Sequence, residues 1–163
     1  MTNILLQNFD KAPFSQIKNT DFEPAFEQAI KEAKQEVLTI SENSEKPNFE
    51  NTLEAMAFSG MKLERISNIF FNLNSAETND ELQKIAQIVA PKLSEFGNDI
   101  TLNSDLFKRV KTVYDLRETL SLSKEQFMLL EKSYKGFVRN GALLSDSKKE
   151  ELRKIDAELS LLS

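Results

Sequence analysis

Apolar side chains recur at intervals of three and four residues along most of the chain, which is the spacing of one face of an α-helix. The first stripe consists of Phe22, Phe26, Ile30, Ala33, Val37 and Ile40. It predicts a helix that starts near Thr20 and fades within 41–44, before Pro47. Residues 1–19 contain Pro13 and mixed polarity, so we expect an extended lead-in over 1–19 and a helical domain over 20–163.

Two longer stripes follow. The second predicts one unbroken helix over 48–73, and the third predicts a helix that opens near Thr78 and reaches Phe96. Gly60 lies within the second stripe, which indicates that another helix approaches closely there. Pro91 lies within the third, where we expect a kink or a short break. The two stripes are Phe49, Leu53, Met56, Gly60, Leu63, Phe70 and Leu73, then Leu82, Ile85, Val89, Leu93 and Phe96.

Three shorter helices are predicted in the rest of the chain. One is capped by Asn103 or Ser104, one covers 123–140 and stops at Asn140-Gly141, and one begins at Ser145 or Asp146. Their stripes are Leu106, Val110 and Val113; Phe127, Leu130, Tyr134 and Phe137; and Leu152, Ile155, Leu159 and Leu162. The last stripe meets no Gly, Pro or turn cluster before Ser163, which we interpret as a chain cut within a longer protein.

Three segments have the pattern of a capping box, in which two side chains satisfy backbone N–H groups at a helix start. They are Thr20–Glu23, Thr78–Glu81 and Ser123–Gln126. The alternation typical of strands is nowhere sustained. The sequence therefore predicts an all-α fold with about six helices packed as antiparallel hairpins.

Composition narrows the classes of partner. The chain has 163 residues with a net charge of −5, which disfavours nucleic acid because phosphates need a positive face. The apolar run near the start is only Ile4-Leu5-Leu6, too short for a signal peptide, and no stretch reaches the roughly 20 apolar residues that cross a bilayer. We expect a cytoplasmic protein that meets neither nucleic acid nor membrane.

The chain contains no histidine and no cysteine. These absences exclude a Ser-His-Asp triad, an H-E-x-x-H zinc helix, thiolate metal sites and disulfides within this sequence. Carboxylates could still bind a hard cation or act in acid–base chemistry. We nevertheless assign no catalytic, cofactor-binding or metal-binding residue to this chain.

Paired carboxylates at helical spacing are the nearest approach to a metal site. The pairs are Glu32 with Glu36, Glu50 with Glu54, and Asp146 with Glu150. Such pairs usually form a solvated helix face with lysines nearby, and the charged run 147–154 fits the same interpretation.

Two further features have a structural and a functional interpretation. The 12 phenylalanines, including Phe70-Phe71, are explained by a large core, or some of their rings face a second domain or a substrate cleft. Arg139 could bind a peptide or a carboxylate, although its place at a helix C-terminus is already favourable for a cation.

Seven segments of the sequence are informative when they are read in order. They are Ala12-Pro13-Phe14-Ser15-Gln16-Ile17, Phe22-Glu23-Pro24-Ala25-Phe26, Pro47-Asn48-Phe49-Glu50-Asn51-Thr52-Leu53, Thr78-Asn79-Asp80-Glu81-Leu82-Gln83, Asn98-Asp99-Ile100-Thr101-Leu102-Asn103, Leu106-Phe107-Lys108-Arg109-Val110 and Phe137-Val138-Arg139-Asn140-Gly141-Ala142. This ordered set resembles the N-terminal region of the thimet oligopeptidase family of zinc metallopeptidases. The chain looks most similar to the bacterial peptidyl-dipeptidase branch of the family, and next to the oligopeptidase A branch. The ordered set spans nearly the whole chain.

The resemblance implies a zinc-dependent parent enzyme several times longer than this chain. In the family, zinc is held by an H-E-x-x-H helix and a later Glu, far downstream of this region, so no catalytic or metal residue carries over to the positions present here. The N-terminal helices of the family form one wall of a deep channel that admits short peptides and excludes folded proteins. We therefore expect zinc in the full-length parent and none in this chain.

Two functions from different classes remain after this comparison. The first is the non-catalytic channel wall of a cytoplasmic peptidase that removes dipeptides from the C-termini of short peptides, with the missing catalytic region as its main partner. The second is a free-standing helical adaptor without catalysis. If the chain is a fragment, we expect it to self-associate weakly through the helices predicted over 123–140 and 145–163, because an apolar surface is left exposed.

Overall fold

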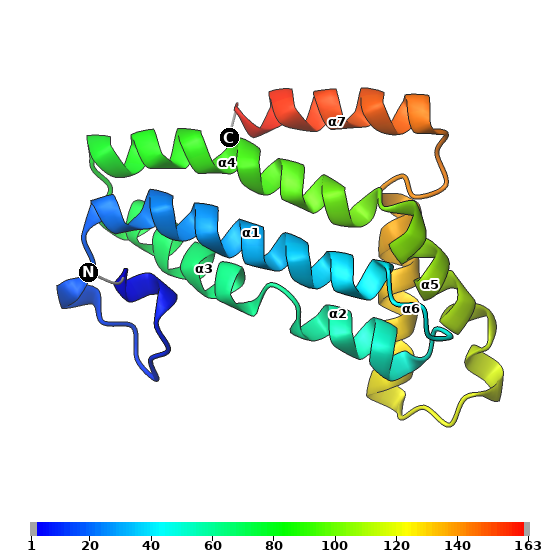
Figure 1. Cartoon of the computed structure of the whole chain (residues 1–163). Coiled ribbons are helices and arrows are strands. Elements are labelled where there is room, and N and C mark those ends of the chain that lie inside the picture. The colour runs from blue at the N-terminus through cyan, green and yellow to red at the C-terminus, as the bar shows by residue number, and fades with distance from the viewer. Residues whose placement is uncertain (1–2, 162–163) are drawn as a thin grey trace.

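The computed structural model describes residues 3–161 and confirms the all-helical prediction (Figure 1). The α-helices are α1 (Phe22–Ser41), α2 (Ala55–Phe58), α3 (Met61–Ala76), α4 (Asp80–Thr101), α5 (Ser104–Asp115), α6 (Lys124–Arg139) and α7 (Asp146–Ser160). A π-helical turn, η4 (Phe49–Glu54), runs directly into α2, and short 3-10 turns cover Ile4–Leu6, Phe14–Gln16, Asn19–Asp21 and Arg117–Thr119. The described residues contain no strand.

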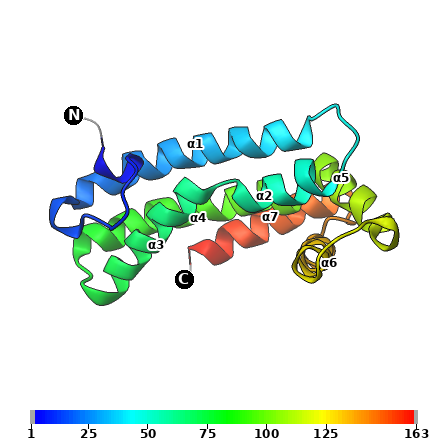
Figure 2. The same ribbon diagram turned by 90° about the horizontal axis from the view of Figure 1, so that it is seen from below.

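The helices form a lengthwise bundle with a crossing pair at one end. α1, the α2–α3 segment, α4 and α7 run side by side with alternating direction, as the antiparallel prediction requires (Figure 1). α5 and α6 pack against each other across the end of this bundle, and α6 is seen almost along its axis in Figure 2.

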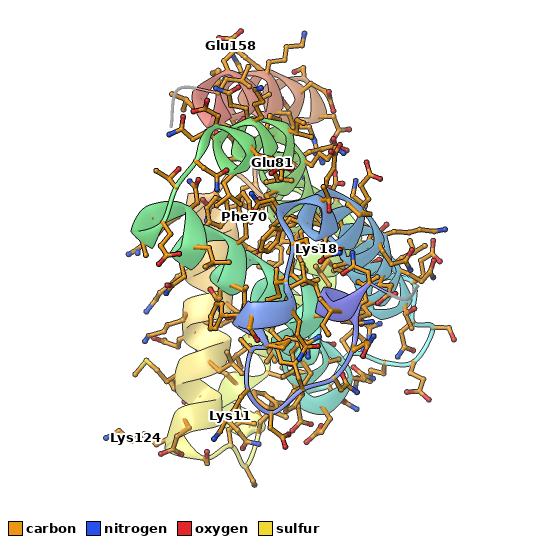
Figure 3. The ribbon with its side chains drawn as sticks, turned by 90° about the vertical axis from the view of Figure 1, so that its left-hand side faces the viewer. Lys11, Lys18, Phe70, Glu81, Lys124 and Glu158 are labelled. Carbon is orange, nitrogen blue, oxygen red and sulfur yellow. The ribbon has the colours of Figure 1, made fainter. Side chains whose placement is uncertain are left out.

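Two hydrophobic clusters stabilise this arrangement. The first joins the lead-in to α1, α3 and α4, and its buried members are Leu5, Phe22, Ala25, Phe26, Ala29, Ile30, Ala33, Leu63, Ile66, Ile69, Phe70, Leu82, Ile85 and Val89. The ring of Phe70 lies in the interior of the bundle in Figure 3 and makes edge contacts with Phe22 and Phe26 at centroid distances of 5.0 and 5.4 Å. Such aromatic pairs add to the free energy gained by burial alone.

The second cluster lies at the end where α5 and α6 cross. Its buried members are Val37, Ile40, Phe49, Leu53, Leu106, Phe107, Val110, Val113, Leu130, Phe137 and Ala142. All six residues of the first predicted stripe are buried, and α1 divides them between the two clusters. This helix therefore connects the two halves of the core.

The prediction of one helix over 48–73 is wrong, because the segment is interrupted at Ser59 and Gly60. Gly60 adopts a φ of +73°, a left-handed conformation that interrupts helical hydrogen bonding and that side chains with a Cβ disfavour. The helix resumes at Met61 and continues to Ala76. The predicted close approach is present: a Cβ built on Gly60 would lie 3.9 Å from that of Ala33 in α1.

Of the kink or short break expected at Pro91, the break is absent, since α4 is continuous from Asp80 to Thr101. A proline in a helix leaves the carbonyl four residues earlier without its partner. Here that residue is Gln87, which is exposed, so water can reach the surface where the bond is missing.

Only one of the three predicted capping boxes forms as expected. Ser123 accepts a hydrogen bond from the backbone N–H of Gln126, whose side chain accepts one from Ser123 in return. The third predicted helix is capped by Asn79 instead of Thr78. At the first, Thr20 lies inside a 3-10 turn, and the carboxylate of Asp21 accepts a bond from the N–H of Lys18.

The predicted helix ends in the second half of the chain are confirmed. Asn103 caps α5 through a hydrogen bond from the N–H of Leu106, and α6 ends before Gly141, whose φ is +93°. The last helix begins after Ser145, as one of the two proposed starts required.

The lead-in predicted as extended contains short 3-10 turns and packs against α3. Leu5 is fully buried in the first cluster, and Arg65 of α3 donates to the carbonyl oxygens of Leu5 and Gln7 at 3.3 and 2.8 Å. The guanidinium of Arg65 also lies over the ring of Phe9, 4.4 Å from its centroid. These contacts hold the first residues of the described chain against the bundle.

Candidate functional site

Glu32 and Glu36, the first of the paired carboxylates, point to protein partners instead of a shared cation. Glu32 lies 2.5 Å from the ammonium of Lys62 and accepts a hydrogen bond from the amide of Gln28. Glu36 accepts a hydrogen bond from the backbone N–H of Gly60 at 2.7 Å. The interpretation as a solvated face with a lysine nearby is confirmed for this pair.

The surroundings of Glu32 favour the charged form of its carboxyl group. The hydrogen bond from Gln28 and then the one from Lys62 hold the pKa of the Glu32 carboxyl below its ordinary value. Glu32 is partly exposed, so we attribute only a small stabilisation to this arrangement.

No metal centre is formed by the residues that the structure describes. Glu50, Glu54, Asp146 and Glu150 are all exposed, and Glu150 lies 3.9 Å from Arg153. Within 3–161, no three groups of the metal-binding types come together. Zinc also prefers nitrogen and sulfur ligands that this sequence does not contain, so its residues do not fit that ion.

Arg109 lies in one of the seven resembling segments and is a buried cation for which the sequence predicted no role of its own. It is 6% exposed and donates to the carbonyl oxygens of Asn43 and Glu45 at 2.6 and 3.2 Å, and to the side-chain oxygen of Asn51 at 2.9 Å. Burial lowers the pKa of its guanidinium, and the charge of Glu45 opposes that shift. Its five donors in a fixed plane suit this task, which is to fix the connection between α1 and η4 against α5.

α7 packs on α4 through its polar residues. Lys149 is its only buried residue among those described, and its ammonium donates to the carbonyl oxygen of Leu102 at 3.2 Å and to the hydroxyl of Ser104 at 2.7 Å. Arg153 pairs with Asp99 of α4 at 2.9 Å. The solvated interpretation of the run 147–154 is therefore wrong at Lys149, because its ammonium satisfies a carbonyl at the C-terminus of α4.

The apolar stripe predicted for this helix does not enter the core. Leu152 is half-buried, whereas Ile155 is 47% exposed and Leu159 is also largely exposed. Leu162, the last predicted member, lies outside the described residues. α7 thus covers α4 with polar side chains while much of its apolar stripe is in contact with solvent.

A groove lies beside the end of α7. It has a volume of about 760 Å³, and its lining consists of Phe71, Asn74, Gln83, Ala86, Gln87, Ala90, Leu93, Ser160 and Leu161. Phe71, the neighbour of the buried Phe70, is 39% exposed here. No contact of this ring within the described residues tests the interpretation in which some phenylalanines face a second domain or a substrate cleft, whereas the large-core interpretation is confirmed for Phe22, Phe26, Phe49, Phe70, Phe107 and Phe137, which are buried.

Arg139 lies exposed in the last turn of α6, where its charge complements the helix dipole. The structure gives it no arrangement that would select a carboxylate. None of the helices described over 3–161 is both long enough and apolar enough to span a membrane.

The curated proteins to which this chain is similar have the names of peptidases. The dipeptidyl carboxypeptidase of Escherichia coli is 37% identical over 150 residues, or 92% of the chain, and that of Salmonella typhimurium is 36% identical over 149 residues. The thimet-like oligopeptidase of Dictyostelium discoideum is 31% identical over 120 residues, or 71% of the chain. The chain therefore belongs to the thimet oligopeptidase family. No family model matches it.

The chain spans only a part of the length of the curated relatives that it matches. It spans 22% of the length of the two dipeptidyl carboxypeptidases and 18% of the Dictyostelium protein. The resemblance in the ordered segments is thus confirmed as homology along nearly the whole chain.

Proposed function

We propose that this chain is the N-terminal, non-catalytic part of a zinc-dependent oligopeptidase of the peptidyl-dipeptidase type. The observation that carries the proposal is the match of 92% of the chain to only 22% of the dipeptidyl carboxypeptidase of Escherichia coli. Since the chain has no imidazole or thiolate, zinc and the water it activates belong to the rest of the parent protein.

The contribution of this region is geometric. Its helices form one wall of the channel that short peptides enter, and the wall limits access by size. Its rigidity is supported by the ion pairs that join neighbouring helices: Lys34 of α1 and Arg153 of α7 both pair with Asp99 of α4, each at 2.9 Å. The parent acts in the cytoplasm on short peptides.

The proposal is tested on the full product of the gene. We expect the sequence beyond Ser163 to encode H-E-x-x-H and a later Glu, and the purified product to release dipeptides from the C-termini of short peptides. A chelator should abolish this release and added zinc should restore it, with products identified by mass spectrometry. A full product without the zinc motif would instead support the free-standing adaptor.

The channel-wall role needs a separate measurement. A short peptide inhibitor with a photoactivatable group should crosslink to residues within 3–161 of the full-length enzyme, and excess unlabelled peptide should prevent this. Crosslinks confined to the downstream region would remove the wall role while leaving the peptidase assignment intact.

A further inference from the structure

The crossing of α5 and α6 contains a column of stacked planar side chains. The ring of Tyr134 in α6 lies between those of Phe107 and Tyr114, which are two turns apart on α5. Its centroid is 3.9 Å from that of Tyr114, with an angle of 6° between the ring planes, and 5.9 Å from that of Phe107. The guanidinium of Arg117 lies 4.2 Å from the centroid of Tyr114, and since Tyr134 occupies one face of this ring, it covers the other. These contacts hold the two phenol rings parallel and in contact.

The composition of the chain makes this pair of rings chemically distinct. The chain contains two tyrosines and no tryptophan, cysteine or histidine, so Tyr114 and Tyr134 are its most readily oxidised aromatic groups. Both side chains are half-buried, so an electron has a short path from either phenol to a small oxidant in solvent. The four methionines react instead with peroxides, which transfer an oxygen atom to sulfur. A one-electron oxidant therefore acts first on the stacked phenols.

We propose that Tyr114 and Tyr134 form an oxidative modification site, at which a one-electron oxidant joins α5 to α6 through a dityrosine bond. Each phenol gives one electron to the oxidant and its O–H proton to water. The unpaired electron of each radical resides partly on the ring carbons beside the oxygen, and one such carbon from each ring combines in a C–C bond. The hydrogen of each bonded carbon then moves to the phenol oxygen, which restores both aromatic rings. The pair loses two electrons and two protons in total, and the helices gain one covalent bond.

The stacked geometry favours this coupling over the other reactions of a phenol radical. A radical on an isolated tyrosine must meet a second one by diffusion, whereas here the partner ring is already in contact, which raises its effective concentration. The rings must tilt out of their parallel stack as the bond forms, and their partial exposure leaves room for this movement. The product closes a loop between residues 114 and 134, so it restricts the unfolded chain as a disulfide does. This chemistry does not depend on the proposed function of the parent.

Photo-oxidation of the full gene product tests this site. A ruthenium tris-bipyridine complex serves as the one-electron oxidant, with persulfate as the final electron acceptor, and the light dose is raised until the two tyrosines are consumed. Peptide mass spectrometry identifies a linked pair of peptides that contain residues 114 and 134 and have lost two hydrogen atoms. The same treatment in urea measures the coupling in the unfolded chain. Tyr114→Phe and Tyr134→Phe are the matched variants, because each keeps a ring in the stack and removes one hydroxyl.

We expect the linked pair to form more than about 10-fold faster in the folded protein than in urea, because folding holds the two rings together. Its yield should be the same at every protein concentration, and neither variant should form it. Consumption of both tyrosines without the link, or equal rates in the folded and unfolded chain, would overturn the proposal. A yield that rises with protein concentration would assign the link to collisions between molecules and would overturn it as well.

Discussion

At the scale of single residues, Arg109 holds in place the segment between α1 and η4, which buries few apolar side chains of its own. The segment between α1 and η4 contains mostly exposed polar residues, yet two of its carbonyl oxygens accept hydrogen bonds from one guanidinium, which also donates to Asn51 of η4. Because a guanidinium presents several donors in one plane, a single side chain satisfies two carbonyls and an amide together.

Replacement of Arg109 by alanine should destabilise the protein by about 1.5–3 kcal/mol, the range for hydrogen bonds to a charged group. Urea denaturation followed by circular dichroism measures the change. Lys108→Ala is the control, because Lys108 is the exposed neighbour on the same helix, and it should alter stability by less than about 0.5 kcal/mol. Equal effects of the two variants would contradict the role assigned to Arg109.

Glu32 should make stability depend on pH in a defined direction. Its folded pKa lies below the ordinary value of 4.5, so its contribution is present above that value and is lost as the pH falls through the folded pKa. The side chain is partly exposed, so we expect less than about 1 kcal/mol. The stability difference between the wild type and Glu32→Gln should therefore be measurable at pH 7 and shrink at about pH 3.

The same substitution made in the Gln28→Ala variant identifies the cause of this pH dependence. In Gln28→Ala the hydrogen bond that contributes most to the lowered pKa of Glu32 is absent, so the effect of Glu32→Gln should be smaller at pH 7. An effect of Glu32→Gln that is the same at both pH values would show that this carboxylate does not contribute through its charge.

At this scale the sequence could predict the chemistry that is absent but not the positions of the buried cations. The lack of histidine and cysteine is visible in the composition, whereas Arg109 and Lys149 occupy ordinary charged positions in the sequence. Their burial depends on carbonyl groups contributed by residues 43, 45 and 102, which are far away in the chain. The spacing of apolar residues along one helix gives no information about acceptors so far away in the chain.

At the scale of helices, Gly60 and Gly97 allow the same substitution to be compared at a helix break and inside a helix. Gly60→Ala should cost about 1–2 kcal/mol, because a Cβ disfavours the left-handed backbone even though the surrounding space is adequate. Gly97→Ala, in the interior of α4 with no heavy atom within 4 Å of the new Cβ, should stabilise by up to about 1 kcal/mol. Thermal unfolding of both variants measures the contrast, and stabilisation by both would show that α3 can join α2 without the break.

Lys149 should determine how firmly α7 is attached. Lys149→Ala removes the donor to Leu102 and Ser104, and we expect faster hydrogen exchange throughout α7 with little change in α1. Lys148→Ala is the control, since Lys148 is exposed and pairs only locally with Glu151. Unchanged exchange in α7 after Lys149→Ala would mean that its other contacts, including those of Arg153 and Asp156, suffice to hold the helix.

Helix positions were predictable because apolar stripes and end signals agree in most of the chain. The break at Gly60 was not, since a glycine inside a continuous stripe reads equally well as a close approach, which is also present. The pattern could not decide between a kink and a break at Pro91, because the cost of a lost hydrogen bond depends on solvent access at Gln87. The burial of Lys149 and the exposure of Ile155 were not predictable from the apolar stripe of α7, although most charged residues of this helix are exposed as expected.

At the scale of the whole molecule, the isolated chain should neither bind zinc tightly nor hydrolyse peptides. Carboxylates alone suit harder cations than zinc, and the described residues do not gather three of them. Isothermal titration with zinc and a chelator-controlled peptidase assay measure both properties. Chelator-sensitive cleavage by a clean preparation would contradict the assignment of catalysis to the rest of the parent.

The division of α1 between two clusters has a consequence for synthesis on the ribosome. The buried residues of the first cluster end at Val89, whereas those of the second extend to Ala142. At usual translation rates the interval between these positions lasts about 3–10 seconds. The first cluster can form during this time, while Val37 and Ile40 still lack their contacts with α5 and α6. At this stage the nascent chain has formed the first cluster, while Val37 and Ile40 at the end of α1 are still exposed. We expect a chaperone to bind at this end of α1.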